Sequence, residues 1–315
     1  MCLPVPIFFV FLLSPILCAS QEITASSYLL LEAQSLEVID GKDYKRPLPP
    51  ASTIKILTAL VALERLRGDE MIVVPRKVLG LPHSRAGLVP GRAYKAIELI
   101  EATLIHSAND AAYTLAKRVA GSEEAFARLM MEKAASLGAK DTVIKNATGL
   151  NAEGQHTTCY DLALILKGAL EHERLRNLLS MRSFSLRHGR KITYYENHNR
   201  LLFCFPPTVG GKTGYTRASR YTYVGAFEKG GRVYILSMLQ SEDLWGDARV
   251  ILSKVFDEVP TEGELRLAKA KVRVEYEAPK KRGKAAPRLA SERKRIKKGV
   301  LRRHKGMDNG RPSGR

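Results

Sequence analysis

The spacing of apolar residues predicts strands toward both ends of the sequence and helices between them. Short apolar stretches at residues 27–31 and near Val38 indicate strands. Residues 97–179 show mainly helical periodicity, with the clearest helices expected at 123–137 and 161–170. The middle of the chain is therefore expected to be largely helical.

Two segments with alternating apolar residues, 221–227 and 233–239, flank a Lys-Gly-Gly turn at 229–231 and predict a β-hairpin. An amphipathic helix is expected after it, at 247–257. Strands from both ends of the chain around a helical insert indicate a mixed α/β fold, in which one antiparallel sheet flanked by helices brings the ends together.

A serine and a lysine begin the predicted helix at 52–67, directly after a proline-rich turn. Ser52 and Lys55 are spaced i and i+3, so their side chains share one face of the first turn. A serine hydroxyl needs an adjacent base to act as a nucleophile, and Lys55 can be that base if its amine is neutral. The helix dipole and nearby cations favour the neutral form. Alone, the pair is more typical of an N-cap serine followed by a solvated lysine.

A second motif, Ser107 to Asn109, lies between two predicted helices, 95–105 and 110–120. Such a corner can direct side chains into a cleft. Ser107 can relay a proton to a leaving group, and the Asn109 amide can hold a substrate carbonyl. Capping of the two helices is the alternative explanation for this serine and asparagine.

The third motif, Lys212 to Gly214, lies in a predicted strand before the hairpin. An edge strand beside the nucleophile can pair with an extended peptide, and Gly214 allows close approach of the backbone. Lys212 adds positive charge for a substrate carboxylate. A phosphate-binding loop is excluded, because Pro206 stands where its first glycine is required and no helix follows.

Taken together and in this order, the three motifs resemble those of the low-molecular-mass penicillin-binding proteins, the serine D-alanyl-D-alanine carboxypeptidases of bacterial cell-wall metabolism. The stretch Asn146 to Leu150 is also similar to a signature of that family, and the likeness covers residues 24–258. The resemblance implies a β-lactamase/transpeptidase-like fold. It also implies peptidoglycan stem peptides ending in D-Ala-D-Ala as substrates and β-lactam antibiotics as covalent inhibitors.

The resemblance also assigns roles to the motif residues. Ser52 is expected to be the acylated nucleophile, Lys55 its base, and Ser107 a further catalytic residue. The other motif residues are expected to bind substrate: Asn109, Lys212, Thr213, Gly214, Tyr215 and Thr216. Within this set, Lys212 and the two threonines are expected to contact the terminal carboxylate. The backbone N–H groups of Ser52 and Tyr215 are expected to form the oxyanion hole.

Three other functions use or tolerate the same motifs. A class A β-lactamase needs a glutamate in a Glu-x-x-Leu-Asn arrangement for deacylation; Glu153 opens a different string, and no such arrangement occurs between Ser107 and Lys212. A catalytically silent wall-binding protein is disfavoured by the intact motifs. A D,D-endopeptidase that cleaves peptidoglycan cross-links remains open beside the carboxypeptidase.

The N-terminal residues 1–20 carry no charge and contain an apolar core from Val5 to Leu17, which is typical of a signal peptide. We therefore expect export to a periplasmic or extracytoplasmic location, with a peptidase domain at 21–260. The absence of Lys or Arg before the apolar core leaves an uncleaved anchor open. Lipidation at Cys18 is disfavoured, because a leucine precedes it. No later apolar run is long enough to span a membrane, so a soluble or peripheral protein is expected.

The formal net charge of +19 is concentrated at the C-terminal end, where residues 261–315 hold 19 Lys and Arg against 6 Asp and Glu. A short strand is expected at 271–276, followed from Pro279 by a basic, disordered tail. Attraction to an anionic membrane surface or wall polymer and simple solubilisation both remain open. The export signal argues against a nucleic-acid partner.

Cysteine and histidine placement gives no sign of a metal centre. The seven histidines are scattered, and no Cys and His cluster has metal-ligand spacing, so no cofactor is expected. Cys159 and Cys204 follow the predicted signal peptide, and two separately buried thiols are favoured over a disulfide.

Overall fold

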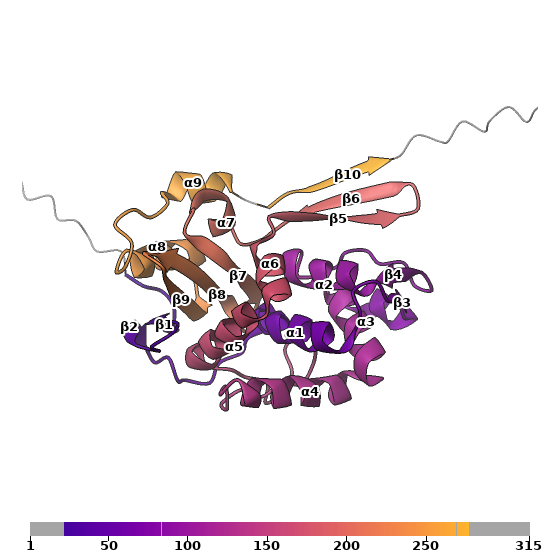
Figure 1. Ribbon diagram of the computed structural model, residues 1–315, viewed down its shortest axis with the longest axis horizontal. Coiled ribbons are helices and arrows are strands. Elements are labelled where there is room, and N and C mark those ends of the chain that lie inside the picture. Colours follow the sequence, from indigo (N-terminus) through magenta and orange to yellow (C-terminus); the bar gives the residue numbers. More distant parts are fainter. Residues whose placement is uncertain (1–21, 83, 269, 277–315) are drawn as a thin grey trace, which may run out of the picture. The chain divides into compact units, whose positions relative to one another are not determined.

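The computed structural model describes residues 22–82, 84–268 and 270–276. Its central element is a five-stranded antiparallel sheet with the spatial order β2-β1-β9-β8-β7 (Figure 1). The five strands are β1 (Ser27–Glu32), β2 (Val38–Lys42), β7 (Thr208–Thr216), β8 (Arg220–Lys229) and β9 (Arg232–Ser241). Ser27 of β1 lies opposite Leu239 of β9, so the sheet joins segments from both ends of the chain. The predicted mixed α/β fold with one antiparallel sheet joining both ends is confirmed.

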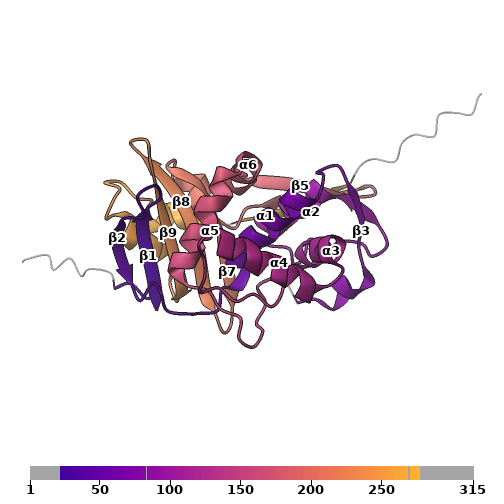
Figure 2. The ribbon, with the colours of Figure 1, turned by 60° about the horizontal axis from the view of Figure 1, so that its bottom comes forward.

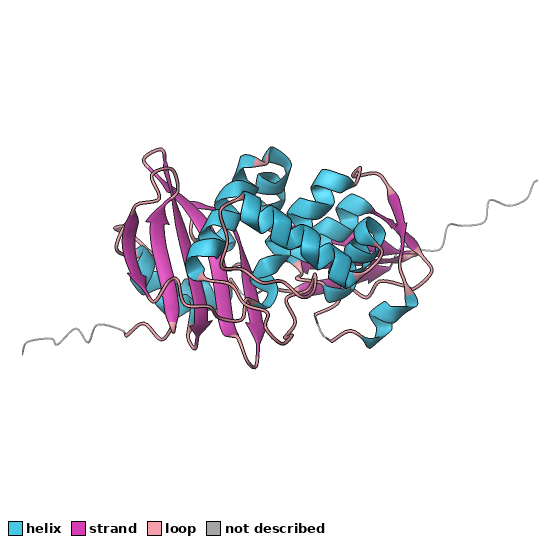
Figure 3. Ribbon diagram, turned by 90° about the horizontal axis from the view of Figure 1, so that it is seen from below, coloured by secondary structure: helices cyan, strands magenta, loops and turns pink. Residues whose placement is uncertain are grey.

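Alternating side chains of the sheet enter two separate apolar clusters, because successive residues of a strand point to opposite faces. Leu29 and Leu31 pack with helices α1 (Lys55–Arg65) and α5 (Cys159–Glu171). Leu30 packs on the other face with α8 (Leu244–Leu252). Figure 2 shows α5 beside β9, and Figure 3 shows most helices gathered on one side of the sheet.

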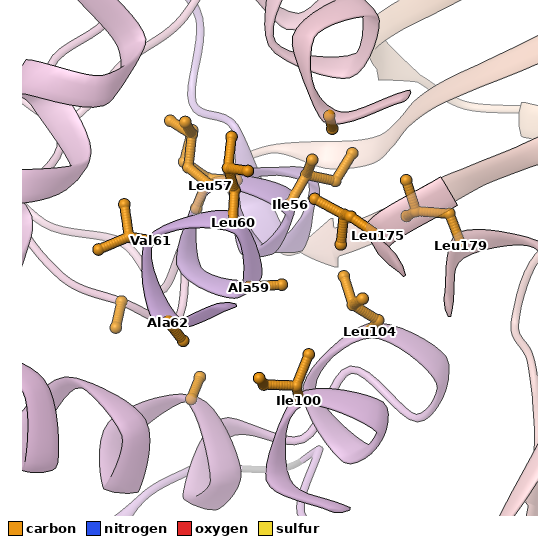
Figure 4. Packing of buried hydrophobic residues seen from close by; sticks show 14 of the residues in the cluster. Ile56, Leu57, Ala59, Leu60, Val61, Ala62, Ile100, Leu104, Leu175 and Leu179 are labelled. Carbon is orange, nitrogen blue, oxygen red and sulfur yellow. The ribbon is translucent and has the colours of Figure 1, made fainter. Parts of the chain in front are cut away.

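Helix α1 is the centre of the helical part. Its side chains from Lys55 to Ala62 are all buried, which is typical of a helix surrounded by other elements. Figure 4 shows Ile56 beside Leu175 of α6 (Glu173–Ser180), whereas Ala59 and Ala62 face Ile100 of α2 (Ala96–Ile105). This packing fixes the N-terminal end of α1, where it meets a short 3-10 turn, η1 (Ala51–Ile54), and strand β7.

Several smaller elements complete the described chain. They are β3 (Met71–Val73), η2 (Arg76–Gly80), β4 (Ala93–Lys95), α3 (Asn109–Ala120), α4 (Glu123–Ser136), β5 (Ser183–His188), β6 (Lys191–Glu196), α7 (Leu201–Cys204), α9 (Glu262–Leu267) and β10 (Val272–Tyr276). Strands β3 and β4 form a two-stranded sheet, and β10, β6 and β5 form a three-stranded one. These two sheets were not expected from the sequence.

The closing helix is shifted from the predicted range of 247–257. It begins earlier because the Asp243 side chain accepts a hydrogen bond from the Gly246 N–H and caps the helix, and it ends at Leu252. Beyond the expected domain boundary at residue 260, α9 and β10 extend the ordered chain, and β10 lies within the range predicted for a strand.

The predicted signal peptide at 1–20 and the basic tail from residue 279 lie outside the described residues. Within the described ranges, no helix is both long and apolar enough to cross a membrane. Cys159 and Cys204 are both free thiols, as expected, but only Cys159 is buried and Cys204 is half-buried.

Candidate active site

Ser52 and Lys55 meet where the η1 turn continues into α1. The Lys55 Nζ lies 2.9 Å from the Ser52 Oγ, which is the contact expected from their i, i+3 spacing. Ala51, directly before the serine, adopts a positive φ of 47°, a strained conformation for an alanine. The turn thus presents the serine hydroxyl to the cleft and to the lysine together.

The Lys55 amine is buried and surrounded by oxygen atoms. Besides Ser52, its Nζ contacts the Asn109 Oδ1 at 2.8 Å and the Thr148 carbonyl oxygen at 2.5 Å. Burial, followed by the positive charge of Lys212, lowers the pKa of Lys55 well below its ordinary value, although Asp110 opposes this shift. A neutral amine has two N–H donors and one lone pair. It can therefore donate to Asn109 and Thr148 and accept the Ser52 proton.

The loop at 146–150 supplies this carbonyl and supports the nucleophile turn. The Asn146 Oδ1 accepts hydrogen bonds from the Thr148 and Gly149 N–H groups, and its amide donates to the Leu150 carbonyl. Gly149 has a φ of +76°, and a Cβ there would lie 1.9 Å from the Ala51 carbonyl oxygen. Only glycine permits this close approach. The sequence showed this stretch only as a family signature, without a role for its backbone.

Ser107, of the second motif, is in contact with Lys212 of the third motif. The Lys212 Nζ lies 3.0 Å from the Ser107 Oγ and 2.8 Å from the Thr213 carbonyl oxygen. Ser107 adopts a positive φ of 59° at the corner between α2 and α3. Burial lowers the pKa of Lys212 to about 7, so this lysine exchanges its proton near neutral pH. Ser107 therefore has a proton-exchanging partner beside it.

Strand β7 forms the open edge of the five-stranded sheet and runs directly beside Ser52. A Cβ on Gly214 would lie 2.6 Å from the Ser52 backbone nitrogen, so only glycine allows this contact. Tyr215, the next residue, is 56% exposed. The Thr216 hydroxyl contacts the Ser219 Oγ at 2.8 Å and the Asn151 Oδ1 at 3.1 Å.

These elements enclose a cleft of about 400 Å³. Seven of the nine predicted site residues line it: Ser52, Ser107, Asn109, Thr213, Gly214, Tyr215 and Thr216. The other two, Lys55 and Lys212, are buried behind Ser52 and Ser107. The structure therefore brings all nine together.

The cleft also contains residues that the sequence did not indicate, notably His198, Arg200 and Trp245. Burial, with the positive charge of Lys212 as the second cause, lowers the pKa of His198 to about 3, so this imidazole is neutral. The sequence does not indicate that any of these three residues lies at the cleft, because tertiary packing brings each of them there.

Comparison with known proteins gives one consistent result. Residues 15–242 match the model of the family described as D-alanyl-D-alanine carboxypeptidase. The chain is 36% identical over 219 residues to D-alanyl-D-alanine carboxypeptidase DacB2 of Mycobacterium tuberculosis, covering 68% of this chain and 74% of that protein. It is 32% identical to D-alanyl-D-alanine carboxypeptidase DacF of Bacillus subtilis, covering 65% of this chain but only 54% of that protein.

A solved structure agrees with these matches. The crystal structure of a D-alanyl-D-alanine carboxypeptidase from Mycobacterium tuberculosis superposes with a TM-score of 0.71 and 31% identity. The superposition covers 77% of this chain and 96% of that chain. The likeness therefore extends over nearly the whole of the mycobacterial fold.

Proposed function

Because the chain belongs to the D-alanyl-D-alanine carboxypeptidase family, we propose that it removes the terminal D-alanine from peptidoglycan stem peptides through an acyl-enzyme on Ser52. The observation that carries this proposal is the contact of 2.9 Å between the Ser52 hydroxyl and the buried Lys55 amine. A buried amine with a lowered pKa is suited to accept the serine proton near neutral pH.

In the first step, Lys55 takes the Ser52 proton as the oxygen attacks the carbonyl carbon of the penultimate D-alanine. The negative charge that develops on the carbonyl oxygen is stabilised by the backbone N–H groups of Ser52 and Tyr215. The close approach of Gly214 to the Ser52 nitrogen supports this assignment, because it brings the two donors to one place. Asn109 holds the substrate amide beside them.

The leaving D-alanine then receives a proton from Ser107, which is resupplied by Lys212. Lys212 and Thr213 bind the terminal carboxylate, with Thr216 further along the same strand. Water then attacks the ester on Ser52: its proton passes through Ser107 to the neutral Lys212, and Lys55 returns its proton to the departing serine oxygen. A β-lactam acylates the same serine and remains attached to it.

The substrate defines where this reaction takes place. Peptidoglycan lies outside the cytoplasmic membrane, so we assign the enzyme an extracytoplasmic location, with residues 1–20 as a signal peptide. The catalytic domain spans residues 21–260, and the basic residues after 279 form a separate tail that is attracted to anionic membrane or wall polymers.

Covalent labelling with a fluorescent penicillin tests the proposal, alongside release of D-alanine from a stem pentapeptide. Ser52→Ala should abolish both signals, and Lys55→Ala should lower both by several orders of magnitude, because the two residues act as one unit. Lys254→Ala, at an exposed position of the same chain, is the control. Stoichiometric labelling of Ser52→Ala would exclude this serine as the nucleophile.

A further inference from the structure

Strand β10 lies at the edge of the sheet that it forms with β6 and β5. The order of that sheet is β10-β6-β5, so one long side of β10 is bonded to β6 and the other side is an edge (Figure 1). No strand within residues 22–82, 84–268 and 270–276 pairs with this open edge. Every residue of β10 is exposed. An open edge of this kind can accept a further strand.

The backbone of β10 alternates between β6 and the open edge. The carbonyl oxygen of Lys271, directly before β10, accepts a hydrogen bond from the Glu196 N–H at 3.0 Å, so Lys271 faces β6. Successive residues of an antiparallel strand direct their N–H and C=O groups to opposite sides. Val272 and Val274 therefore direct theirs to the open edge, where a second chain can reach them.

The side chains of β10 divide into a charged row and an apolar row. The guanidinium carbon of Arg273 lies 4.7 Å from the centre of the Tyr194 ring, and the Tyr194 hydroxyl donates to the Glu275 carboxylate at 3.1 Å. Both charged residues thus lie on the Tyr194 face of the sheet. By alternation, Val272 and Val274 lie on the opposite face, where they are 55% and 43% exposed. Both rows are open to a partner.

Strand β10 is complementary to a second copy of itself. In an antiparallel pair centred on Val274, Arg273 lies opposite the partner's Glu275, and the two-fold axis repeats this pair. Because Val274 faces the open edge, it exchanges hydrogen bonds with the partner's Val274. The Arg–Glu pairs are then of the non-hydrogen-bonded kind, in which side chains lie closest. Opposite charges in such positions stabilise strand pairing.

Other registers are disfavoured by the same side chains. A shift by two residues in one direction places Arg273 opposite the partner's Arg273, and a shift in the other direction places Glu275 opposite the partner's Glu275. Like charges directly opposite each other destabilise a strand pair. A shift by one residue places each charge opposite an apolar residue and joins the charged row to the apolar row. The register centred on Val274 avoids both faults.

We propose that the protein forms a two-fold symmetric dimer in which β10 pairs antiparallel with β10 of a second copy, so that their two small sheets become one continuous sheet. Each copy contributes one short strand, so the interface is small and association is expected to be weak. Among the described residues, none of those that line the cleft around Ser52 belongs to β10. The inference therefore does not depend on the proposed function.

Sedimentation velocity of the full chain between about 1 and about 100 µM, at physiological ionic strength, tests the inference. The wild type should change from monomer to dimer over this range. Arg273→Glu should raise the Kd of the dimer about tenfold or more, because both Arg–Glu pairs become pairs of like charge. Arg266→Glu makes the same change in charge on α9 and likewise removes an exposed ion pair, so it is the matched control.

Two further variants test the register and the edge. Arg273→Glu combined with Glu275→Arg should restore the Kd of the wild type, because it reverses both charges of each pair. Val274→Pro should abolish the dimer, since proline removes an N–H that faces the open edge and leaves the bonds to β6 in place. An unchanged midpoint of thermal unfolding shows that each variant is folded.

A wild type that stays monomeric throughout this range would overturn the inference. A dimer that persists in folded Val274→Pro would place the interface elsewhere and overturn it as well. The same holds if the exchange of both charges fails to restore the association lost in Arg273→Glu, because the Arg–Glu pairs would then not be the contacts that join the two copies.

Discussion

Replacing Lys212 with methionine should make the stability of the folded protein less dependent on pH. Burial lowers the pKa of Lys212 from 10.5 to about 7. At pH values between these two pKa values, Lys212 is protonated in the unfolded chain, whereas it is neutral in the folded protein. The unfolded state therefore binds more protons, and the free energy of unfolding of the wild type rises with pH in this window.

The size of this effect follows from the shift. Each pKa unit corresponds to about 1.36 kcal/mol, so Lys212 adds about 2.5 kcal/mol to the free energy of unfolding between about pH 7.5 and about pH 9.5. The side chain is only 2% exposed, so solvent screens little of this. Methionine also removes the hydrogen bonds to Ser107 and Thr213, but that loss does not vary with pH. The positive charge of Lys212 lowers the pKa of Lys55 too, so its removal reduces the slope further.

Urea unfolding of the wild type and Lys212→Met at about pH 7.5, 8.5 and 9.5 measures the effect. The stability difference, wild type minus variant, should increase by about 2.5 kcal/mol or more across the series, since the contributions of groups other than Lys212 and Lys55 cancel. Lys254→Met makes the same chemical change at an exposed position and is the control. A difference that stays constant with pH would refute the burial of an amine with a lowered pKa at residue 212.

Three shorter predictions concern the substrate, the nucleophile turn and the tail. Lys212→Ala should lower kcat/KM more for a peptide ending in free D-Ala-D-Ala than for its C-terminal amide, whereas equal losses would assign the lysine a general electrostatic role. Gly149→Ala should lower the free energy of unfolding by more than about 2 kcal/mol, measured by thermal unfolding, and should slow acylation, because its Cβ would lie 1.9 Å from the Ala51 carbonyl oxygen. Gly230→Ala, where φ is also positive at +60° but the space is open, should lower it less. Equal losses would contradict the steric cause. Removal of residues 279–315 should leave penicillin labelling unchanged and release the protein from anionic vesicles, as added salt should also do; binding that survives truncation would assign the tail no such role.

The motif residues could be predicted because their geometry is set locally. The i, i+3 spacing of Ser52 and Lys55 fixes their contact in any helical first turn, and a corner between two helices directs Ser107 into the cleft. The hairpin of β8 and β9 was likewise visible in alternating residues. Phe184 and Leu186 of β5 alternate in the same way, although no strand was predicted there.

Other parts of the site depend on tertiary packing and carry no local pattern. The carbonyl of Thr148 is a backbone atom, so no residue type indicates its contact with Lys55. The main cause of the lowered pKa of Lys55 is burial by surrounding elements, which the sequence did not indicate. The sequence suggested the helix dipole and nearby cations, and the positive charge of Lys212 is the second cause. Arg200 and Trp245 are 45 positions apart in the sequence and meet only because α7 and α8 pack near the same sheet.

The pairing of β1 with β9 sets the order in which this enzyme can assemble. Ser27 has its partner at Leu239, and the Thr24 hydroxyl reaches Asp247, more than 200 positions later in the chain. Such distant contacts form late, because a long loop must close before they contribute any stability. The nucleophile turn is synthesised early, but β7 beside it belongs to a five-stranded sheet that is complete only after β9 has been synthesised. Catalytic competence therefore requires that β9 has been synthesised, and a chain truncated before β9 retains the serine and lysine without a working site.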